Sequence, residues 1–242
     1  MRGRATERET LALLLGRVDY GESDVIVTFL TEELGKVGAL VRGGRKSRRR
    51  AGGALEPMQT ARVTLEDRGG ELSTLREARV ERPRVALLGN LTALETAGTA
   101  LRWARHACPP RMPEPEVFAE LSLLLDDLDA GAAAGREDAL LARFGVRLLE
   151  HVGWGLELGQ CIVCGKPRPP ARAAIVSAAR GGVLCVGCAG HAIGAPKGAA
   201  EGAVRGALVD AIASHAIESP AEVALALTWV RTALAAHAGY EE

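Results

Sequence analysis

The sequence predicts a multidomain α and β protein, in which an N-terminal β-barrel is followed by a helical bundle with a small cysteine-rich insertion. Three observations lead to this fold class. Short apolar segments separated by turn residues fill residues 1–80, which is typical of an all-β domain. From Arg82 onward, apolar residues recur every three to four positions, as in amphipathic helices. Two Cys-x-x-Cys pairs then interrupt the helical region.

The first 80 residues contain five apolar segments with the length of strands. We expect these strands at 10–18, 25–31, 36–41, 60–66 and 72–78. Residues 67–70, Asp-Arg-Gly-Gly, join the last two as a hairpin-type turn. Five short strands with no long helix among them fit a small closed barrel. We therefore predict a five-stranded OB-type β-barrel, the oligonucleotide-binding fold, with an SH3-like barrel as the alternative.

Five helices are expected after the barrel. Their ranges are 82–108, 113–129, 136–152, 200–216 and 220–238. The last start is the best marked, because Ser219 can cap the helix, Pro220 suits its first position and Glu222 follows closely. The domains expected from these elements are a barrel at 1–80, a helical domain formed by 81–156 and 191–242, and a zinc-binding module inserted at 157–190.

Four of the five cysteines form two matched pairs, Cys161 with Cys164 and Cys185 with Cys188, separated by 20 residues. A pair with two intervening residues points both thiolates at one ion, and two pairs complete the tetrahedral shell of zinc at Zn–S distances of about 2.3 Å. Four thiolates leave no open position for water or substrate. We therefore expect one structural Zn²⁺ per chain, which the module needs because so short a segment cannot fold on apolar burial alone.

Two disulfides, a redox dithiol and coincidence are the competing interpretations of the cysteines. Coincidence is disfavoured by the matched pairs, and a redox dithiol requires one Cys-x-x-Cys at a strand-to-helix turn, not two that face each other. His191, three residues after Cys188, could compete as a ligand, but four thiolates already complete the shell. The fifth cysteine, Cys108, is interpreted as a small buried apolar side chain.

Composition restricts the possible functions. The formal net charge is zero, so the chain as a whole is not drawn to nucleic acid or membrane, and an aromatic content of 3% disfavours a surface of many stacking rings. No apolar run approaches the roughly 18 residues of a membrane span, and the charged start does not fit a secretory signal. Because the zinc site requires reduced thiols, we expect a cytoplasmic, nucleoid-associated protein.

Positive charge is concentrated at residues 42–53, between the third and fourth expected strands. Six basic residues occupy the nine positions 42–50 without an acidic neighbour. Guanidinium groups fork onto phosphate oxygens, so this segment predicts contacts to a nucleic-acid backbone, with little sequence preference and steep salt dependence. The expected contacts are Lys36, Arg42, Arg45, Lys46, Arg48, Arg49, Arg50 and Arg62. A solvated loop is the alternative interpretation.

No catalytic constellation is visible in the sequence. Asp126, Asp127 and Asp129 resemble a carboxylate cluster, but we interpret them as a solvated helix face because no matching acids occur elsewhere. The histidines are scattered, and neither a phosphate-binding Gly-x-x-x-x-Gly-Lys loop nor a nucleophile elbow is present. We therefore expect a protein that is not an enzyme, and a nuclease in particular is disfavoured.

Several segments resemble the bacterial RecO family of recombination mediators. They are Tyr20-Gly21-Glu22-Ser23-Asp24 with 25–30, Gly35-Lys36, Gly43-Gly44-Arg45-Lys46, Gly53-Ala54-Leu55-Glu56-Pro57 and the four cysteines. The resemblance covers the whole chain in order, from barrel through helices and cysteine insertion to helices. It implies a protein without enzymatic activity that binds single- and double-stranded DNA and anneals complementary strands.

The resemblance also implies partners. Members of the family partner RecR, contact the acidic C-terminal tail of the single-stranded DNA-binding protein and help to load RecA. Some lack the cysteines, which supports a structural role for zinc. Arg205 and Arg231, on the last two expected helices, could meet an acidic tail. The alternative function is a zinc-stapled adaptor whose helical domain binds partner proteins and which contacts DNA only weakly.

Overall fold

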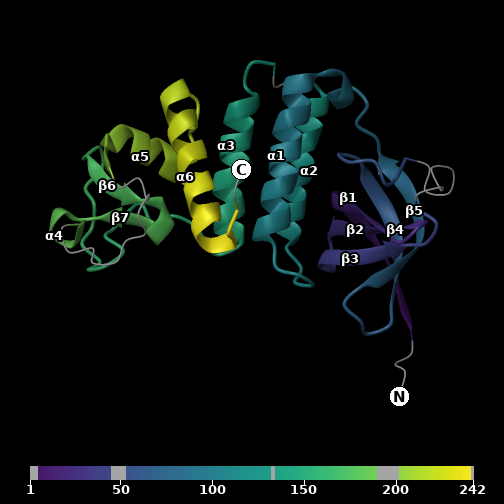
Figure 1. The fold of residues 1–242 in the computed structure, drawn as a ribbon. Coiled ribbons are helices and arrows are strands. Elements are labelled where there is room, and N and C mark those ends of the chain that lie inside the picture. Colours follow the sequence, from purple (N-terminus) through teal and green to yellow (C-terminus); the bar gives the residue numbers. More distant parts are fainter. Residues whose placement is uncertain (1–4, 45–52, 132–133, 190–201, 241–242) are drawn as a thin grey trace. The chain divides into compact units, whose positions relative to one another are not determined.

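The computed structural model describes residues 5–44, 53–131, 134–189 and 202–240. The chain divides into two compact units, Met1–Ala134 and Gly135–Glu242, which we describe separately. The first unit contains strands β1–β5 and two helices, and the second contains the four paired cysteines, a small sheet and the remaining helices (Figure 1). Within the described ranges, no helix combines the length and apolar character that crossing a bilayer requires.

Five strands form the sheet of the first unit. They are β1 (Thr6–Tyr20), β2 (Asp24–Thr31), β3 (Gly35–Val41), β4 (Thr60–Asp67) and β5 (Ser73–Arg82). The sheet closes into a barrel in the order β1-β2-β3-β5-β4, in which a short parallel pairing of β3 with β5 is the only parallel contact among the described strands. The predicted five-stranded sheet is confirmed, although β1 and β5 are longer than expected.

The length of β1 allows the sheet to close. Residues 6–13 pair with β4, residues 12–20 pair with β2, and both pairings are antiparallel. The register shifts between Leu14 and Gly16, and a bulge of this kind bends a strand so that it can turn from one neighbour to the next. Side chains that alternate along the strands then fill the interior. The core residues are Ala12, Leu14, Val25, Val27, Phe29, Val37, Ala39, Val41, Ala54, Ala61, Val63 and Leu65.

Two helices complete the first unit, α1 (Leu91–Ala107) and α2 (Pro115–Asp129), and they lie side by side (Figure 1). The helix predicted from residue 82 begins later, because β5 continues to Arg82 and a 3₁₀ turn, η1 (Leu87–Gly89), follows. The start of α1 is fixed by Asn90, whose side-chain oxygen accepts a hydrogen bond from the Ala93 amide at 3.2 Å.

Arg84 joins the barrel to α2. Its side chain is only 1% exposed, and its Nε donates to Oδ1 of Asp126 at 2.8 Å, while Nη1 donates to the Met58 carbonyl at 2.8 Å and to Thr60 Oγ1 at 3.1 Å. Burial lowers the pKa of Arg84, and the Asp126 carboxylate opposes that shift. A buried charge satisfied in this way is costly to disturb.

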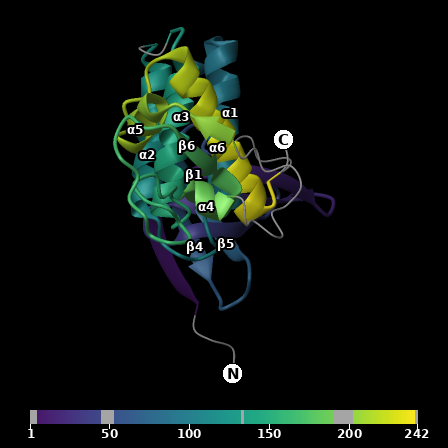
Figure 2. The ribbon, with the colours of Figure 1, turned by 90° about the vertical axis from the view of Figure 1, so that its left-hand side faces the viewer.

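The second unit combines helices with a small sheet. Its elements are α3 (Glu137–His151), β6 (Ala174–Ser177), η2 (Ala178–Arg180), β7 (Gly182–Leu184), α4 (Val186–Ala189), β8 (Gly202–Val204), α5 (Gly206–Ala213) and α6 (Pro220–Ala238). α3 and α6 pack against each other and lie side by side in both views (Figures 1 and 2). The predicted start of α6 is confirmed, because Ser219 and Glu222 form a reciprocal capping box.

The predicted helix 200–216 is wrong in its first part. Residues 202–204 form strand β8, which pairs antiparallel with β6, and the helix begins only at Gly206. Pairing with a neighbouring strand overrides the helix propensity of this alanine-rich segment. The three-stranded sheet, in the order β7-β6-β8, therefore extends past residue 190. The domain limits drawn from the sequence stay a prediction, and the compact units of the structure group α1 and α2 with the barrel.

Candidate metal centre and candidate nucleic-acid interface

The four paired cysteines come together in the second unit. The sulfur atoms of Cys161, Cys164, Cys185 and Cys188 all lie within 4.8 Å of one another, and the Sγ atoms of Cys164 and Cys185 are 3.7 Å apart. Sulfurs bound to one tetrahedral ion at about 2.3 Å are separated by about 3.8 Å. All five cysteines are free thiols, so the structure contains no disulfide in this cluster. Four sulfur donors at this separation fit a metal such as zinc.

Each Cys-x-x-Cys pair forms one knuckle, residues 161–164 and residues 185–188. Backbone amides of these two knuckles surround the Cys161 sulfur. Hydrogen bonds from the amides of Cys185, Cys164 and Val163 lower the pKa of Cys161 to about 6. Hydrogen bonds with Cys185 and Cys164 instead raise the pKa of Cys188 to about 12. Four sulfurs this close cannot all carry a negative charge unless a cation compensates them, and a divalent metal ion would supply that charge.

A short strand aligns the second knuckle with the first. The amide of Val183 donates to the Glu157 carbonyl, and the amide of Ile162 donates to the Val183 carbonyl, both at 2.9 Å. Gly182 makes this approach possible, because its φ is +152° and a side chain there would collide with the carbonyl of Glu157. Cys185 follows directly after β7 and is thereby placed beside Cys161.

A polar contact that was not predicted from the sequence holds the first knuckle against α5. The guanidinium of Arg168 forms an ion pair with Asp210 and donates to the Leu158 carbonyl at 2.8 Å. Asp210 also accepts a hydrogen bond from the Ala171 amide at 2.7 Å, and these contacts, led by Arg168, lower its pKa. No local spacing links Arg168 with Asp210, because they are far apart in sequence.

The expected nucleic-acid contacts lie in the first unit, and most of them fall outside the described residues. Those outside are Arg45, Lys46, Arg48, Arg49 and Arg50. Arg42 is described and exposed, directly after β3. The turn that carries it is fixed by Asp24, whose carboxylate accepts from the Gly43 amide at 2.8 Å and from Ser23 at 3.0 Å, and the Gly43 bond is the main cause of its lowered pKa.

Lys36 and Arg62 already have partners in the protein. The Nζ atom of Lys36 donates to the Arg105 carbonyl at 2.6 Å, near the end of α1, where a positive charge is favoured, and burial lowers the pKa of Lys36. Arg62 donates to both carboxylate oxygens of Glu81 at 3.1 and 3.2 Å, and its Nη1 lies 3.5 Å from Glu9. Both residues are therefore less available for phosphate than Arg42.

The interpretation of the aspartates at the end of α2 requires correction. Asp126 forms ion pairs with Arg82 and Arg84, and Asp129 accepts a hydrogen bond from the Leu87 amide at 2.9 Å. These carboxylates hold the segment between β5 and α1, so they are more than a solvated face. These ion pairs could have been predicted only by pairing the aspartates with arginines about 42 residues earlier in the sequence.

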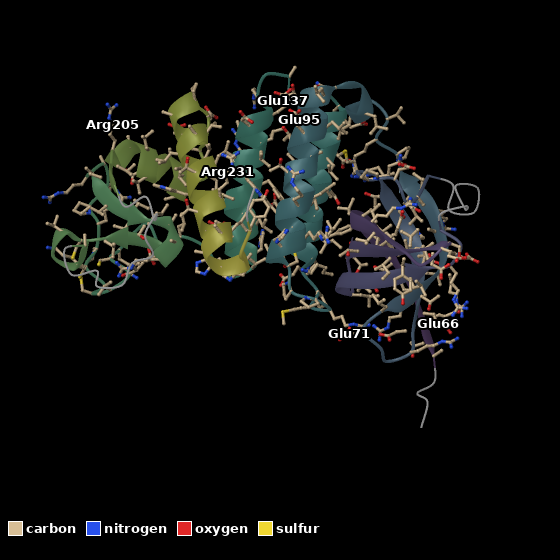
Figure 3. The ribbon with its side chains drawn as sticks, in the orientation of Figure 1. Glu66, Glu71, Glu95, Glu137, Arg205 and Arg231 are labelled. Carbon is tan, nitrogen blue, oxygen red and sulfur yellow. The ribbon has the colours of Figure 1, made fainter. Side chains whose placement is uncertain are left out.

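The remaining candidates are placed as follows. Cys108 is buried, as predicted, and burial raises its pKa to about 12. His191 lies outside the described residues. Arg205 is the N-terminal flanking residue of α5 and points away from that helix, whereas Arg231 lies on α6 (Figure 3).

Comparison with known proteins identifies the family. The family model described as "Recombination protein O N terminal" matches residues 5–84, and "Recombination protein O C terminal" matches residues 88–240. The DNA repair protein RecO of Anaeromyxobacter sp. (strain K) is 42% identical over 180 residues, which cover 73% of this chain and 68% of that protein. The same-named protein of Geobacter sulfurreducens is 39% identical over 188 residues, covering 78% and 74%.

A third relative, the DNA repair protein RecO of Myxococcus xanthus, is 37% identical over 177 residues, which cover 73% of this chain and 70% of that protein. Together the two family models span nearly the whole chain, including the barrel and the four cysteines. The chain therefore belongs to the recombination protein O family of DNA repair proteins.

Proposed function

We propose that this protein is a non-enzymatic recombination mediator, which binds single- and double-stranded DNA and anneals complementary strands. With RecR, it helps to load RecA onto DNA coated by the single-stranded DNA-binding protein, whose acidic C-terminal tail it contacts. Membership in a family of DNA repair proteins supports the role in repair. The individual partners follow from the resemblance of the sequence to that family.

The observation that carries the DNA-binding proposal is the position of the basic segment on the barrel. The strand order β1-β2-β3-β5-β4 and the parallel contact of β3 with β5 support the OB type. In the sequence, residues 42–53 form the first part of the connection from β3 to β4, and Arg42 is exposed where this connection begins. We assign phosphate contacts to Arg42 and, within the same segment, to Arg45, Lys46, Arg48, Arg49 and Arg50. Lys36 and Arg62 contribute less, because each already bonds to other residues of this chain.

A salt titration tests this proposal. Replacing Arg48, Arg49 and Arg50 together with Ala should weaken binding to a single-stranded oligonucleotide. It should also reduce the slope of log K against log salt concentration by about 2, since each phosphate contact on a single strand contributes roughly 0.7. Binding is measured by fluorescence anisotropy at several salt concentrations. An unchanged affinity together with an unchanged slope would remove these residues from the proposal.

A matched control separates this effect from a general change in charge. Arg79 is also exposed and lies on β5, where it is 3.7 Å from Glu9. Arg79→Ala should leave both the affinity and the salt slope close to those of the unmodified protein. Degradation of intact DNA that depends on divalent ions would contradict the non-enzymatic part of the proposal.

The cysteine cluster is proposed to hold one structural Zn²⁺. The chemistry of the four sulfur donors and the amides that surround Cys161 support this assignment. Cys161, Cys164, Cys185 and Cys188 would all be ligands, which leaves zinc without an open position for a reaction. Atomic absorption should give one zinc per chain.

One observation supports the alternative function, a zinc-stapled adaptor. Both knuckles carry an apolar side chain on the surface, because Val163 is 56% exposed and Val186 is 83% exposed. Exposed apolar groups beside a rigid metal site suit contact with a partner protein. The Ala variant of Arg48, Arg49 and Arg50 discriminates, since an adaptor would retain its repair function in cells after losing affinity for DNA.

A further inference from the structure

Apart from Arg8 and Arg42, the described arginines of the first unit fall into two groups. Those of one group each have a carboxylate partner: Arg62, Arg68, Arg76, Arg79, Arg82, Arg84 and Arg111. Arg17 on β1, and Arg102 and Arg105 on α1, are exposed and have no acidic partner among the residues that the structure describes. Arg102 donates a hydrogen bond to Thr99 Oγ1 at 2.8 Å. Positive charge without an acidic partner therefore gathers at one place on this unit, where Arg17 and Arg102 line the same groove.

That place is a groove between the barrel and α1. Its walls are the end of the β1 bulge, the segment that leads from the basic connection into β4, and one face of α1. Gly16, Arg17, Glu56, Met58, Gly98 and Arg102 are among the residues that line it. The groove has a volume of about 330 Å³. Most of its lining is apolar, and its charged groups are two arginines and one glutamate.

Arg105 adds a third guanidinium at the rim. A Cβ atom placed on Gly16 would lie 2.8 Å from Nη1 of Arg105, so this side chain crosses the backbone of β1 where the strand has no side chain. Arg102 and Arg105 are three residues apart on α1 and therefore share a helix face. Gly16 allows this close approach, because it has no side chain.

The wall opposite α1 is held in a fixed position. Met58 is buried, and its carbonyl accepts a hydrogen bond from the buried Arg84 at 2.8 Å. Ala54 belongs to the barrel core, and the Glu56 amide donates to the Gly53 carbonyl at 3.0 Å. The groove is therefore formed before a ligand arrives, which reduces the entropic cost of binding.

Charge and shape identify the occupant. Three guanidinium groups against one carboxylate, Glu56, favour an anion, and guanidinium forks match phosphate oxygens. The apolar floor suits the face of a base or a sugar. Pockets for small ligands begin at about 300 Å³, so this groove accommodates one unit of a chain and not a duplex. A base can enter it only when it is unstacked, as in single strands.

We propose that the groove binds one unstacked nucleotide of single-stranded DNA, with the base on the apolar floor and neighbouring phosphates on Arg17, Arg102 and Arg105. This inference rests on the proposed DNA-binding function and deepens it. It supplies a site that favours single strands, in addition to the proposed contacts of the basic segment, which do not discriminate between single strands and duplexes. Residues 53–58 lead from that segment directly into the groove wall.

The first test removes the charges. In the full-length protein, replacing Arg17, Arg102 and Arg105 with Gln should lower the affinity for a single-stranded oligonucleotide at least tenfold. The affinity for a duplex of the same length should change less than twofold. Arg102→Gln is compared with Arg79→Gln, a matched change of an arginine that already has a carboxylate partner. Glu56→Gln should strengthen single-strand binding, because it removes the only acid in the lining.

The second test fills the groove without changing its charge. A Cβ at Gly98 would meet only the flexible end of Arg102, at 3.4 Å. Leucine also has a higher helix propensity than glycine in a helix interior. Gly98→Leu should therefore preserve the fold and occupy the groove. An oligonucleotide carrying 2-aminopurine should become brighter on binding the unmodified protein, as the base unstacks, and this increase should be lost in Gly98→Leu.

The outcomes separate the inference from the proposed function. If the unmodified protein binds no DNA, the proposed function fails and the inference fails with it. If it binds single strands, but the triple Gln and Gly98→Leu variants bind them equally well, only the inference is overturned. Equal losses for single strands and duplexes would also overturn it. An acidic peptide that binds the unmodified protein but not the triple variant, with single-strand affinity unaffected, would assign the groove to a protein partner instead.

Discussion

The barrel of the first unit encloses a core of apolar side chains contributed by every strand, whereas the cysteine region of the second unit is built on three strands of three or four residues each. In the barrel, burial of apolar area supplies the stability. In the cysteine region, knuckle residues such as Val163 and Val186 remain on the surface. The apolar core there is small and includes Val176, Val183 and Leu184, so we expect a bound metal ion and polar contacts to supply a larger share of the stability than in the barrel. Chemical changes should therefore affect the two regions differently.

Loss of the metal should produce the largest difference. Cys164→Ser removes one ligand, and structural zinc contributes about 10–16 kcal/mol to the folding of small zinc-binding peptides. We expect the variant to lose zinc and residues 157–189 to exchange their amide hydrogens rapidly, while β1–β5 remain protected. Atomic absorption and hydrogen exchange measure the two effects. Cys108→Ser serves as the control, since Cys108 is outside the cluster, and it should retain zinc. Rapid amide exchange in the barrel of Cys164→Ser would contradict the expectation that the barrel is stable without the metal.

Removing a buried charge should have the next largest effect, and it should act on the first unit. Arg84→Met leaves Oδ1 of Asp126 and the Met58 carbonyl without their donor, at an expected cost of about 2–3 kcal/mol in the free energy of unfolding. Arg82→Met is the matched control, because Arg82 pairs with the same carboxylate but is 59% exposed, and it should cost about 0–1 kcal/mol. Urea denaturation compares them. Equal losses of unfolding free energy in the two variants would show that the buried Arg84 stabilises the first unit no more than the exposed Arg82 does.

A single glycine should distinguish packing around the knuckles from bonding to the metal. Gly182→Ala forces a side chain against the Glu157 carbonyl and should cost about 1–3 kcal/mol in strain, with weaker zinc retention in a chelator competition. Gly187→Ala, in the second knuckle, would meet no atom within 4 Å and should have little effect. If both variants release zinc at the same chelator concentration, alignment of the knuckles by β7 is not what positions the ligands.

The smallest expected effect concerns the response of the barrel to pH. Glu66 is buried on β4 (Figure 3), and its hydrogen bonds with Arg68 and then Arg76 lower its pKa below the ordinary 4.5. A carboxyl group with a lowered pKa stabilises the folded state above its ordinary pKa, and this stabilisation is lost as the pH falls through the folded value. The stability difference between the unmodified protein and Glu66→Gln should therefore shrink below pH 4.5. A constant difference in urea midpoints between pH 7 and pH 3 would contradict this.

Local patterns in the sequence predicted much of the fold. The alternation of Val25, Val27 and Phe29 indicates a strand, and the Ser219–Glu222 capping box indicates a helix start. Both are properties of a few adjacent residues. The start of α1 and strand β8 were missed, because each depends on contacts with distant parts of the chain.

The cluster of four cysteines was predictable from spacing, but the groove was not. The spacing of two residues within each Cys-x-x-Cys pair places its two sulfurs close together, and the structure brings all four sulfurs together. Arg17 and Arg102 are far apart in sequence and look like other surface arginines. What sets them apart is that both lack a carboxylate partner in the described structure and line one groove, whereas Arg62 has two such partners. Only three-dimensional pairing could separate them.

We propose that the cysteine cluster supports the fold while the first unit binds DNA. The most direct test is to titrate single-stranded DNA against the zinc-loaded protein and against Cys164→Ser, with zinc content and hydrogen exchange measured on the same samples. We predict that the variant loses zinc and protection at residues 157–189 but binds DNA within twofold of the unmodified protein. A fall in DNA affinity that accompanies the loss of zinc, with the barrel still protected, would contradict this account.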